Sequence, residues 1–98
     1  MARLAEIGSY DGAVQAGDDL LELIFDDIKR VADLEVTNRT LRHVTIVSDE
    51  GNRFEINGFP FEVRNNIFAT PTNGRADLMT IRSFRPLQNC NVMINYIR

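Results

Sequence analysis

The chain has one histidine and one cysteine, the two side chains most often used in metal binding and nucleophilic chemistry. His43 stands between Arg42 and Val44 in a strand-like run, and Cys90 lies far along the chain. A zinc site needs three or four ligands at workable spacing. A cysteine nucleophile needs an activating base, for which only His43 is an obvious candidate. We therefore expect His43 to be a packed or surface strand residue, Cys90 to be a small buried apolar residue, and the protein to need no metal or cofactor.

The acidic and glycine-rich stretches also fall short of known catalytic or ion-binding patterns. Residues 18–19 and 26–27 are adjacent acids on a helix, where neighbouring side chains point about 100° apart and cannot form a carboxylate dyad. Residues 49–52 lack the length and alternation of a calcium loop. Residues 8–12 lack the lysine of a phosphate-binding loop. The sequence therefore predicts a protein that is not an enzyme.

The basic residues are unusual in type, because the chain has ten arginines and a single lysine. Interfaces are enriched in arginine and depleted in lysine, so two interpretations stand: a lineage that favours arginine codons, or a surface that contacts other molecules. Arginines near Phe68 and Phe84 could also hold single-stranded nucleic acid on a sheet. The net charge of −3 disfavours that hypothesis. The arginines concerned are Arg64, Arg75, Arg82 and Arg85.

Residues 18–33 carry the strongest periodic pattern and predict an amphipathic helix. Their apolar residues recur at spacings of three and four, and such a broad stripe is more typical of a core-facing side than of a binding groove. Asp18 is the expected N-cap, because its carboxylate can accept hydrogen bonds from the first turn. Asp26 and Arg30 are spaced to pair at i,i+4.

Residues 42–97 predict a mainly antiparallel sheet. Three strand-like runs are separated by turn signals at residues 51–52 and 57–58, so we interpret residues 42–63 as a β-meander. Further strands are expected at residues 78–84 and 90–97. The last of these has apolar residues on both faces, which indicates a central strand or one covered on both sides. The expected core residues are Ile24, Phe25, Ile28, Ile46, Phe54, Ile56, Ile81, Val92 and Ile94.

Residues 1–17 predict an N-terminal arm, because they contain three glycines and few apolar residues. Such an arm cannot order itself, so it must lie either on the chain's own sheet or on another subunit. Residues 18–98 predict a single α+β domain, in which one amphipathic helix packs on a mainly antiparallel β-sheet or small sandwich.

Residues 55–63, an Ile-Asn-Gly hairpin followed by apolar residues, and the final strand at 91–98 resemble small β-rich structural proteins of tailed bacteriophages. The resemblance implies a virion component such as a capsid-associated, connector or tail subunit, whose partners are copies of itself and other assembly proteins. It carries over no functional residue. The alternative is a small binding or regulatory module for nucleic acid or a protein partner. No signal peptide or transmembrane segment is expected, so the expected location is the virion or the cytoplasm.

An uneven distribution of charge indicates how copies would meet. Residues 1–35 carry a net charge of −6, and residues 36–98 carry +3. Each copy could lay its arm and acidic surface on the arginine-bearing sheet of a neighbour in a head-to-tail contact. Deleting residues 1–17 should then abolish assembly and leave the domain folded. The expected interface residues are the apolar anchors Leu4, Ile7, Phe59 and Phe61, with Arg64, Arg75, Arg82 and Arg85 around them.

Overall fold

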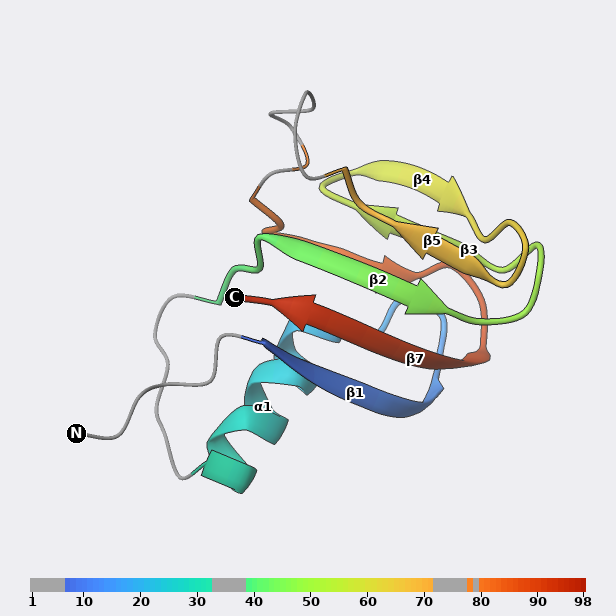
Figure 1. Cartoon of the computed structure of the whole chain (residues 1–98). Coiled ribbons are helices and arrows are strands. Elements are labelled where there is room, and N and C mark those ends of the chain that lie inside the picture. Colours follow the sequence, from blue (N-terminus) through green and yellow to red (C-terminus); the bar gives the residue numbers. More distant parts are fainter. Residues whose placement is uncertain (1–6, 33–38, 72–77, 79) are drawn as a thin grey trace.

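The computed structural model describes residues 7–32, 39–71, 78 and 80–98. In that part of the chain one helix packs on two antiparallel sheets, which confirms the expected α+β class (Figure 1). The elements in chain order are β1 (Ile7–Val14), α1 (Leu20–Ala32), β2 (His43–Val47), β3 (Arg53–Ile56), β4 (Phe59–Glu62), β5 (Ile67–Ala69), β6 (Phe84–Pro86) and β7 (Cys90–Ile97).

The larger sheet has four strands in the order β1-β7-β2-β5, and the smaller sheet has three in the order β4-β3-β6. β7 lies between β1 and β2, so the last strand, expected to be either central or covered on both sides, is central. Figure 1 shows α1 behind β1 and β7, with the smaller sheet next to β5. The larger sheet therefore has one face toward the helix and one face turned away from it.

The described part of the expected N-terminal arm is a strand of the chain's own sheet. Ile7 lies opposite Ile97, and the antiparallel register continues without interruption to Val14 opposite Cys90. Of the two alternatives for the arm, the chain's own sheet is therefore the one that orders residues 7–14. A neighbouring subunit is not needed to order these residues.

The meander predicted at residues 42–63 is wrong in its first half. β2 pairs with β7 and β5, whereas β3 pairs with β4 and β6 in the other sheet. Residues 48–52 thus cross between the sheets, with Gly51 at a φ of 87°. The second half is confirmed, because Asn57 and Gly58 have φ values of 51° and 85° and join β3 to β4 as a hairpin. A turn signal ends a strand, but it does not specify which strand becomes the neighbour.

The helix begins at Leu20, because Asp19 rather than Asp18 is its N-cap. Asp19 Oδ1 accepts a hydrogen bond from the Glu22 N–H at 3.1 Å. Asp18 instead closes the preceding turn, where its Oδ2 accepts from the Gln15 N–H at 2.8 Å. Both acids are used at the helix start, and the sequence-based prediction chose the wrong one of the two.

The ion pairs on the helix surface also differ from the prediction. Arg30 pairs with Asp27 at i,i+3 rather than with Asp26 at i,i+4. Asp26 instead lies 3.9 Å from the guanidinium of Arg39. The arginines and Asp26 are exposed and Asp27 is partly exposed, so we expect the exchange of partners to have little effect on stability.

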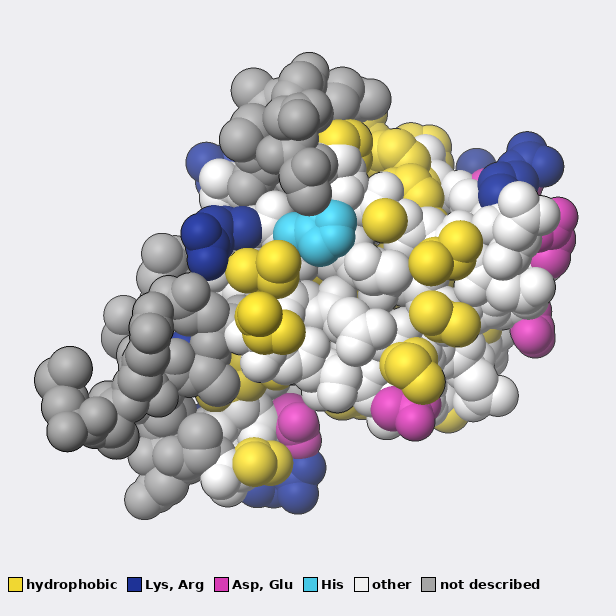
Figure 2. Space-filling view, viewed as in Figure 1, with side chains coloured by type: hydrophobic (Ala, Val, Ile, Leu, Met, Phe, Trp, Pro, Cys, Tyr) yellow, Lys and Arg dark blue, Asp and Glu magenta, His cyan; other side chains and the backbone are white. Residues whose placement is uncertain are grey.

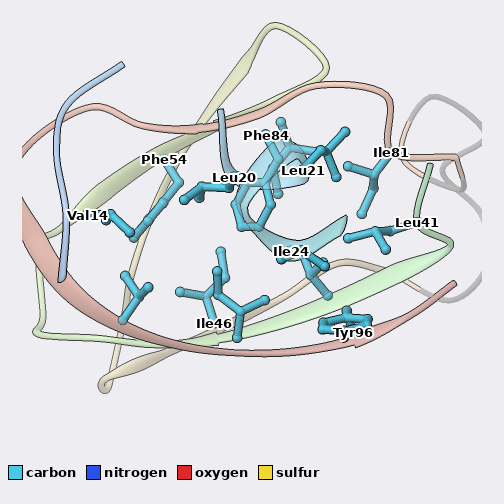
Figure 3. Packing of buried hydrophobic residues seen from close by; sticks show 14 of the residues in the cluster. Val14, Leu20, Leu21, Ile24, Leu41, Ile46, Phe54, Ile81, Phe84 and Tyr96 are labelled. Atoms are coloured by element: carbon cyan, nitrogen blue, oxygen red, sulfur yellow. The ribbon is translucent and has the colours of Figure 1, made fainter. Parts of the chain in front are cut away.

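The core fills the space between the helix and the two sheets. Eight of the nine predicted core residues are buried, and Ile28 is half-buried against the same cluster. Figure 3 shows the helix side chains Leu20, Leu21 and Ile24 among residues from both sheets. The rings of Phe54 and Phe84 of the smaller sheet lie 6.2 Å apart in this cluster.

The strand predicted at residues 78–84 does not form as such, since β6 is limited to Phe84–Pro86. Leu78, Ile81 and Phe84 are all fully buried. A spacing of three cannot place all three side chains on one face of a strand. The described residues before β6 therefore form no regular strand, and Ile81 makes an isolated bridge with Leu41.

Candidate functional site: the open face of the larger sheet

The face of the larger sheet that is turned away from α1 is called the open face here. Strand alternation directs Val44 and Ile46 into the core and leaves Thr45 and Val47 on the open face. Most of its side chains are exposed, and none is fully buried. Its members are Ile7, Ser9, Asp11 and Ala13 of β1, His43, Thr45 and Val47 of β2, Ile67 and Ala69 of β5, and Asn91, Met93, Asn95 and Ile97 of β7.

The register of the strands arranges three large apolar side chains of the open face in one row. Val47 lies opposite Ile67 on one side and Met93 on the other. Directly opposed residues have Cβ atoms about 5 Å apart, so the three side chains are neighbours. Their exposed fractions are 48% for Ile67, 44% for Met93 and 38% for Val47. The row ends at the carboxylate of Asp11, which lies opposite Met93 on β1.

A second row crosses the same face at the other end of the strands. Ile97 lies opposite Ile7 and His43, and Ile7 is 74% exposed. Figure 2 views the molecule from this side and shows hydrophobic groups separated by polar ones, with the histidine among them. Small or polar side chains separate the two apolar rows: Ser9, Asn95, Thr45 and Ala69.

His43 is held by two threonines. Its Nδ1 lies 2.9 Å from Thr70 Oγ1, and its Nε2 lies 3.3 Å from Thr45 Oγ1. Thr70 is buried, and its Oγ1 also accepts from the Val44 N–H at 3.1 Å. Both ring nitrogens therefore have polar partners within the protein, and the ring is fixed as part of the strand surface.

Cys90 and His43 cannot act together. Cys90 begins β7 and His43 lies opposite Ile97 near its end, which places them about 23 Å apart along the strand at roughly 3.3 Å per residue. Burial raises the pKa of the Cys90 thiol; the hydrogen bond with Ser48 lowers it in part, and the nearby charge of Asp49 adds a smaller upward shift. The thiol therefore stays protonated at neutral pH and is a poor nucleophile.

The predicted apolar anchors do not gather on one surface. Ile7 lies on the open face, whereas Phe59 and Phe61 lie on β4 of the smaller sheet. Phe59 is 43% exposed, but the Phe61 ring packs on the Phe68 ring at 4.8 Å and is half-buried. Leu4 lies outside the described residues. Only Ile7 among the described anchors belongs to the open face.

The predicted interface arginines also lie in different places. Arg64 makes an ion pair with Glu62 at 2.8 Å, and the Arg85 guanidinium donates to the Gly17 carbonyl at 2.9 Å. Arg82 is exposed beside the β3–β4 hairpin, where its backbone N–H donates to Asn57 Oδ1. Arg75 lies outside the described residues.

The aromatic residues proposed to accompany these arginines do not form a stacking surface. Phe84 is fully buried, and Phe68 is half-buried against the Phe61 ring. A nucleobase needs an exposed ring face to stack on. The described part of the chain therefore does not offer the sheet-bound arrangement that the nucleic-acid hypothesis required of Phe68 and Phe84.

Sequence reasoning missed Val47, Ile67 and Met93 as surface residues of interest. The signal was present, because Met93 and Ile97 were placed on the second face of the last strand. That strand was then expected to be central or covered on both sides. It is central, yet among the described residues nothing covers its second face, since Met93 remains 44% exposed. Apolar residues on the second face of a strand are therefore compatible with an open face as well as with a covered one.

The described residues contain no group of three or more His, Cys, Asp or Glu side chains placed to hold a metal ion. The described helix is too short and too polar to cross a membrane. Comparison with known proteins gave no family model, no curated protein and no solved structure that matches the chain.

Proposed function

We propose that this protein is a non-enzymatic structural subunit of a larger protein assembly and that it contacts its neighbours through the open face. The class of assembly we propose is the virion of a tailed bacteriophage, on the strength of the hairpin and final-strand resemblance. The partners are copies of the chain and other assembly proteins. The observation that carries this proposal is the row formed by Ile67, Val47 and Met93 on three adjacent strands.

The composition of the open face supports an interface in preference to a solvated surface. In a sheet covered on one side, residues along each strand normally alternate, with apolar residues on the covered face and polar residues on the solvent face. On the open face of this protein, two rows of apolar side chains lie among the polar ones. Contiguous exposed apolar groups mark sites of protein association. Small side chains between the rows, such as Ser9 and Thr45, leave a surface on which another sheet or helix could pack closely.

The test measures the mass of the full chain by light scattering over a range of concentrations. We expect particles larger than a dimer as the concentration rises. Replacing the central row with polar residues that keep strand propensity, Val47→Thr with Met93→Thr, should reduce the mass to that of a dimer or monomer. Because the contact is apolar, raising salt should not reverse the association.

The matched control is Val31→Thr, which removes an equally apolar side chain that is 73% exposed on the helix. This variant should assemble like the unmodified chain. A chain that never exceeds the mass of a dimer at high concentration would contradict assembly through the open face. So would an equal loss of assembly in the helix control.

A further inference from the structure

The four sheet edges of the described chain differ in how well they are protected against pairing with another strand. β5 and β6 are three residues long, and β4 and β6 contain Pro60 and Pro86. Short length and proline are the usual means by which proteins block their sheet edges. β1 is eight residues long and contains no proline, lysine or arginine. Its one charged side chain is Asp11, so β1 is the least protected of the four edges.

The edge of β1 that faces away from β7 has backbone N–H and C=O groups at regular spacing. All eight residues keep an unbroken antiparallel register with β7, so the strand has no bulge that would twist the edge away. Among the described residues, β7 is the only strand paired with β1. Alternate N–H and C=O groups of β1 therefore point away from β7, ready for a second strand.

We propose that β1 pairs antiparallel with β1 of a second copy of this chain, so that two larger sheets join into one sheet of eight strands. A strand edge is self-complementary under a two-fold axis, which makes such a contact isologous and closed. The inference deepens the proposed function and rests on it, because it names the first contact between copies. Growth beyond this dimer would use the open faces.

The charge pattern of β1 selects one register for the pair. With a two-fold axis perpendicular to the sheet, open-face residues meet open-face residues. A pair centred on Asp11 would oppose two carboxylates, which is unfavourable. A pair centred on Tyr10 instead places Ser9 opposite Asp11 of the second copy, twice by symmetry. There the hydroxyl can donate a hydrogen bond to the carboxylate.

The inner side of β1 fits the same register. Tyr10 is half-buried and packs against the core, and its ring lies over Gly12. In the register centred on Tyr10, the two tyrosines oppose each other and Gly8 lies opposite Gly12 of the second copy. Glycines thus flank both rings, where any larger side chain would compete for space. A Cβ at Gly8 would also collide with the Tyr96 phenol within the chain itself.

The contact is small, so we expect a weak dimer. An eight-residue strand pair buries less than the roughly 1,600 Å² of a standard protein interface. Its dissociation constant should therefore lie well above the nanomolar range, and the dimer should be populated only at high protein concentration. Joining the sheets also joins the open faces, which gives the assembly a wider apolar surface than either copy has alone.

A charge swap on the exposed side of β1 tests the register by sedimentation equilibrium. Ser9→Asp opposes carboxylates at two symmetric positions and should weaken dimerisation about tenfold at low salt, with a smaller effect at high salt. Adding Asp11→Ser to Ser9→Asp restores one carboxylate per opposed pair. The dissociation constant of the dimer should then return to within about twofold of the value for the unmodified chain. The control Asn65→Asp adds the same charge to an exposed turn residue between β4 and β5, outside the open face and at the side of the larger sheet opposite β1, and should leave dimerisation nearly unchanged.

Cross-linking gives an independent readout of the same register. In a Cys90→Ser background, chains carrying Ser9→Cys are mixed with chains carrying Asp11→Cys and treated with a short thiol cross-linker. The mixture should yield several times more cross-linked dimer than either variant alone, because positions 9 and 11 are directly opposed. Urea denaturation of each variant confirms that the single chain remains folded.

The outcomes separate this inference from the proposed function. The β1 pairing is overturned if large assemblies form, the charge swap has no effect, and cross-linking is equal in all samples. The proposed assembly through the open face then still stands. A dimer that shows the swap and the cross-link but never grows, and that ignores Val47→Thr with Met93→Thr, supports the pairing and overturns assembly through the open face. A chain that is monomeric at all concentrations overturns both.

Discussion

Tyr96 is the buried ionisable residue whose environment has the clearest consequence for stability. It lies on the inner face of β7 and is 6% exposed. Burial raises the pKa of the Tyr96 phenol, and the charge of Asp27 raises it further, while Arg98 opposes the shift. The folded state thus holds the phenolic proton more tightly than the unfolded chain does.

We predict that stability declines at alkaline pH through this residue. Because the folded pKa is above the unfolded value, the contribution is fully present below about pH 10, the ordinary tyrosine value, and is lost as the pH rises through the folded pKa. Urea denaturation of the unmodified chain and of Tyr96→Phe between pH 8 and pH 11 should show a steeper decline for the unmodified chain. Parallel curves for the two proteins would contradict the prediction.

The roles of single residues were only partly predictable from the sequence. Asn57 and Gly58 were identified as a tight turn, because both tolerate a positive φ. Asp19 was passed over in favour of its neighbour Asp18, since either acid satisfies the local rule for a cap. Which one caps the helix depends on where the chain turns after Gln15, and that is set by packing.

At the scale of elements, the side chain of Asn57 in the β3–β4 hairpin makes hydrogen bonds with the segment before β6. Asn57 Oδ1 accepts from the backbone N–H groups of Arg82 and Ser83 at 2.8 and 3.2 Å. Its Nδ2 donates to the Thr80 carbonyl at 2.9 Å. The same asparagine therefore shapes the turn and supplies three hydrogen bonds to a distant part of the sequence.

We predict that Asn57→Gly lowers the free energy of unfolding by about 1–3 kcal/mol, because glycine keeps the positive φ but leaves backbone groups without their partners. Asn57→Asp keeps the acceptor and loses only the donor to Thr80, so its loss should be smaller. Both are measured by urea denaturation. If the glycine variant is as stable as the unmodified chain, the three hydrogen bonds do not hold the hairpin in place.

Elements with a clear hydrophobic period were predictable from the sequence, but the strands with which they pair were not. The apolar stripe of α1 and the alternation of β7 follow from helical and strand geometry, which is local. The pairing of β2 with β5 and β7 rather than with β3 is a choice among several apolar strands, which no single turn determines. The strand expected at residues 78–84 was wrong because the buried residues Leu78, Ile81 and Phe84 are spaced by three, which the alternation of a strand cannot accommodate.

A cluster of polar side chains links the two sheets near residues 48–52, where the chain crosses from one sheet to the other. Ser48 Oγ donates to the Asn91 carbonyl of β7 at 2.7 Å and accepts from Asn52 Nδ2 at 2.8 Å. Gln88 Nε2 then donates to Asn52 Oδ1 at 2.9 Å, and its Oε1 accepts from the Arg53 N–H of β3. These contacts fix the distance between the sheets where the chain passes from one to the other.

At the scale of the whole molecule, β1 belongs to the sheet, and this changes what a truncation does. Val14 is part of the core, and Tyr10 packs against it. Removing residues 1–17 would therefore uncover one side of β7 and open the core, instead of detaching a separate arm as first expected.

We predict that the chain lacking residues 1–17 loses cooperative unfolding or aggregates, because β7 would become an exposed edge with apolar residues on both faces. Circular dichroism during a urea titration is the measurement. The control Val31→Thr changes a side chain that is 73% exposed on the helix and leaves β1 in place, so it should unfold cooperatively like the unmodified chain. A cooperative transition in the longer truncation would contradict the structural role of β1.

The overall class and most of the core were predictable because they depend on hydrophobic period alone. The open face was not identified, because a sequence does not state that a strand lacks cover on one side. Its apolar residues were explained by an expected second layer. The structure instead packs α1 and the smaller sheet around the core on the other side, and no described element lies over the open face.

The central position of β7 also sets the order in which the fold can be completed. β1 and β2 emerge from the ribosome before β7, and neither pairs with the other, since β7 lies between them. Until residues 90–97 have been synthesised, the larger sheet has only the β2–β5 pairing. Joining sequence-distant strands is slow compared with forming local contacts, so the nascent chain displays β1 as an unpaired strand for most of its synthesis. A chaperone or an already folded copy could bind it during that interval.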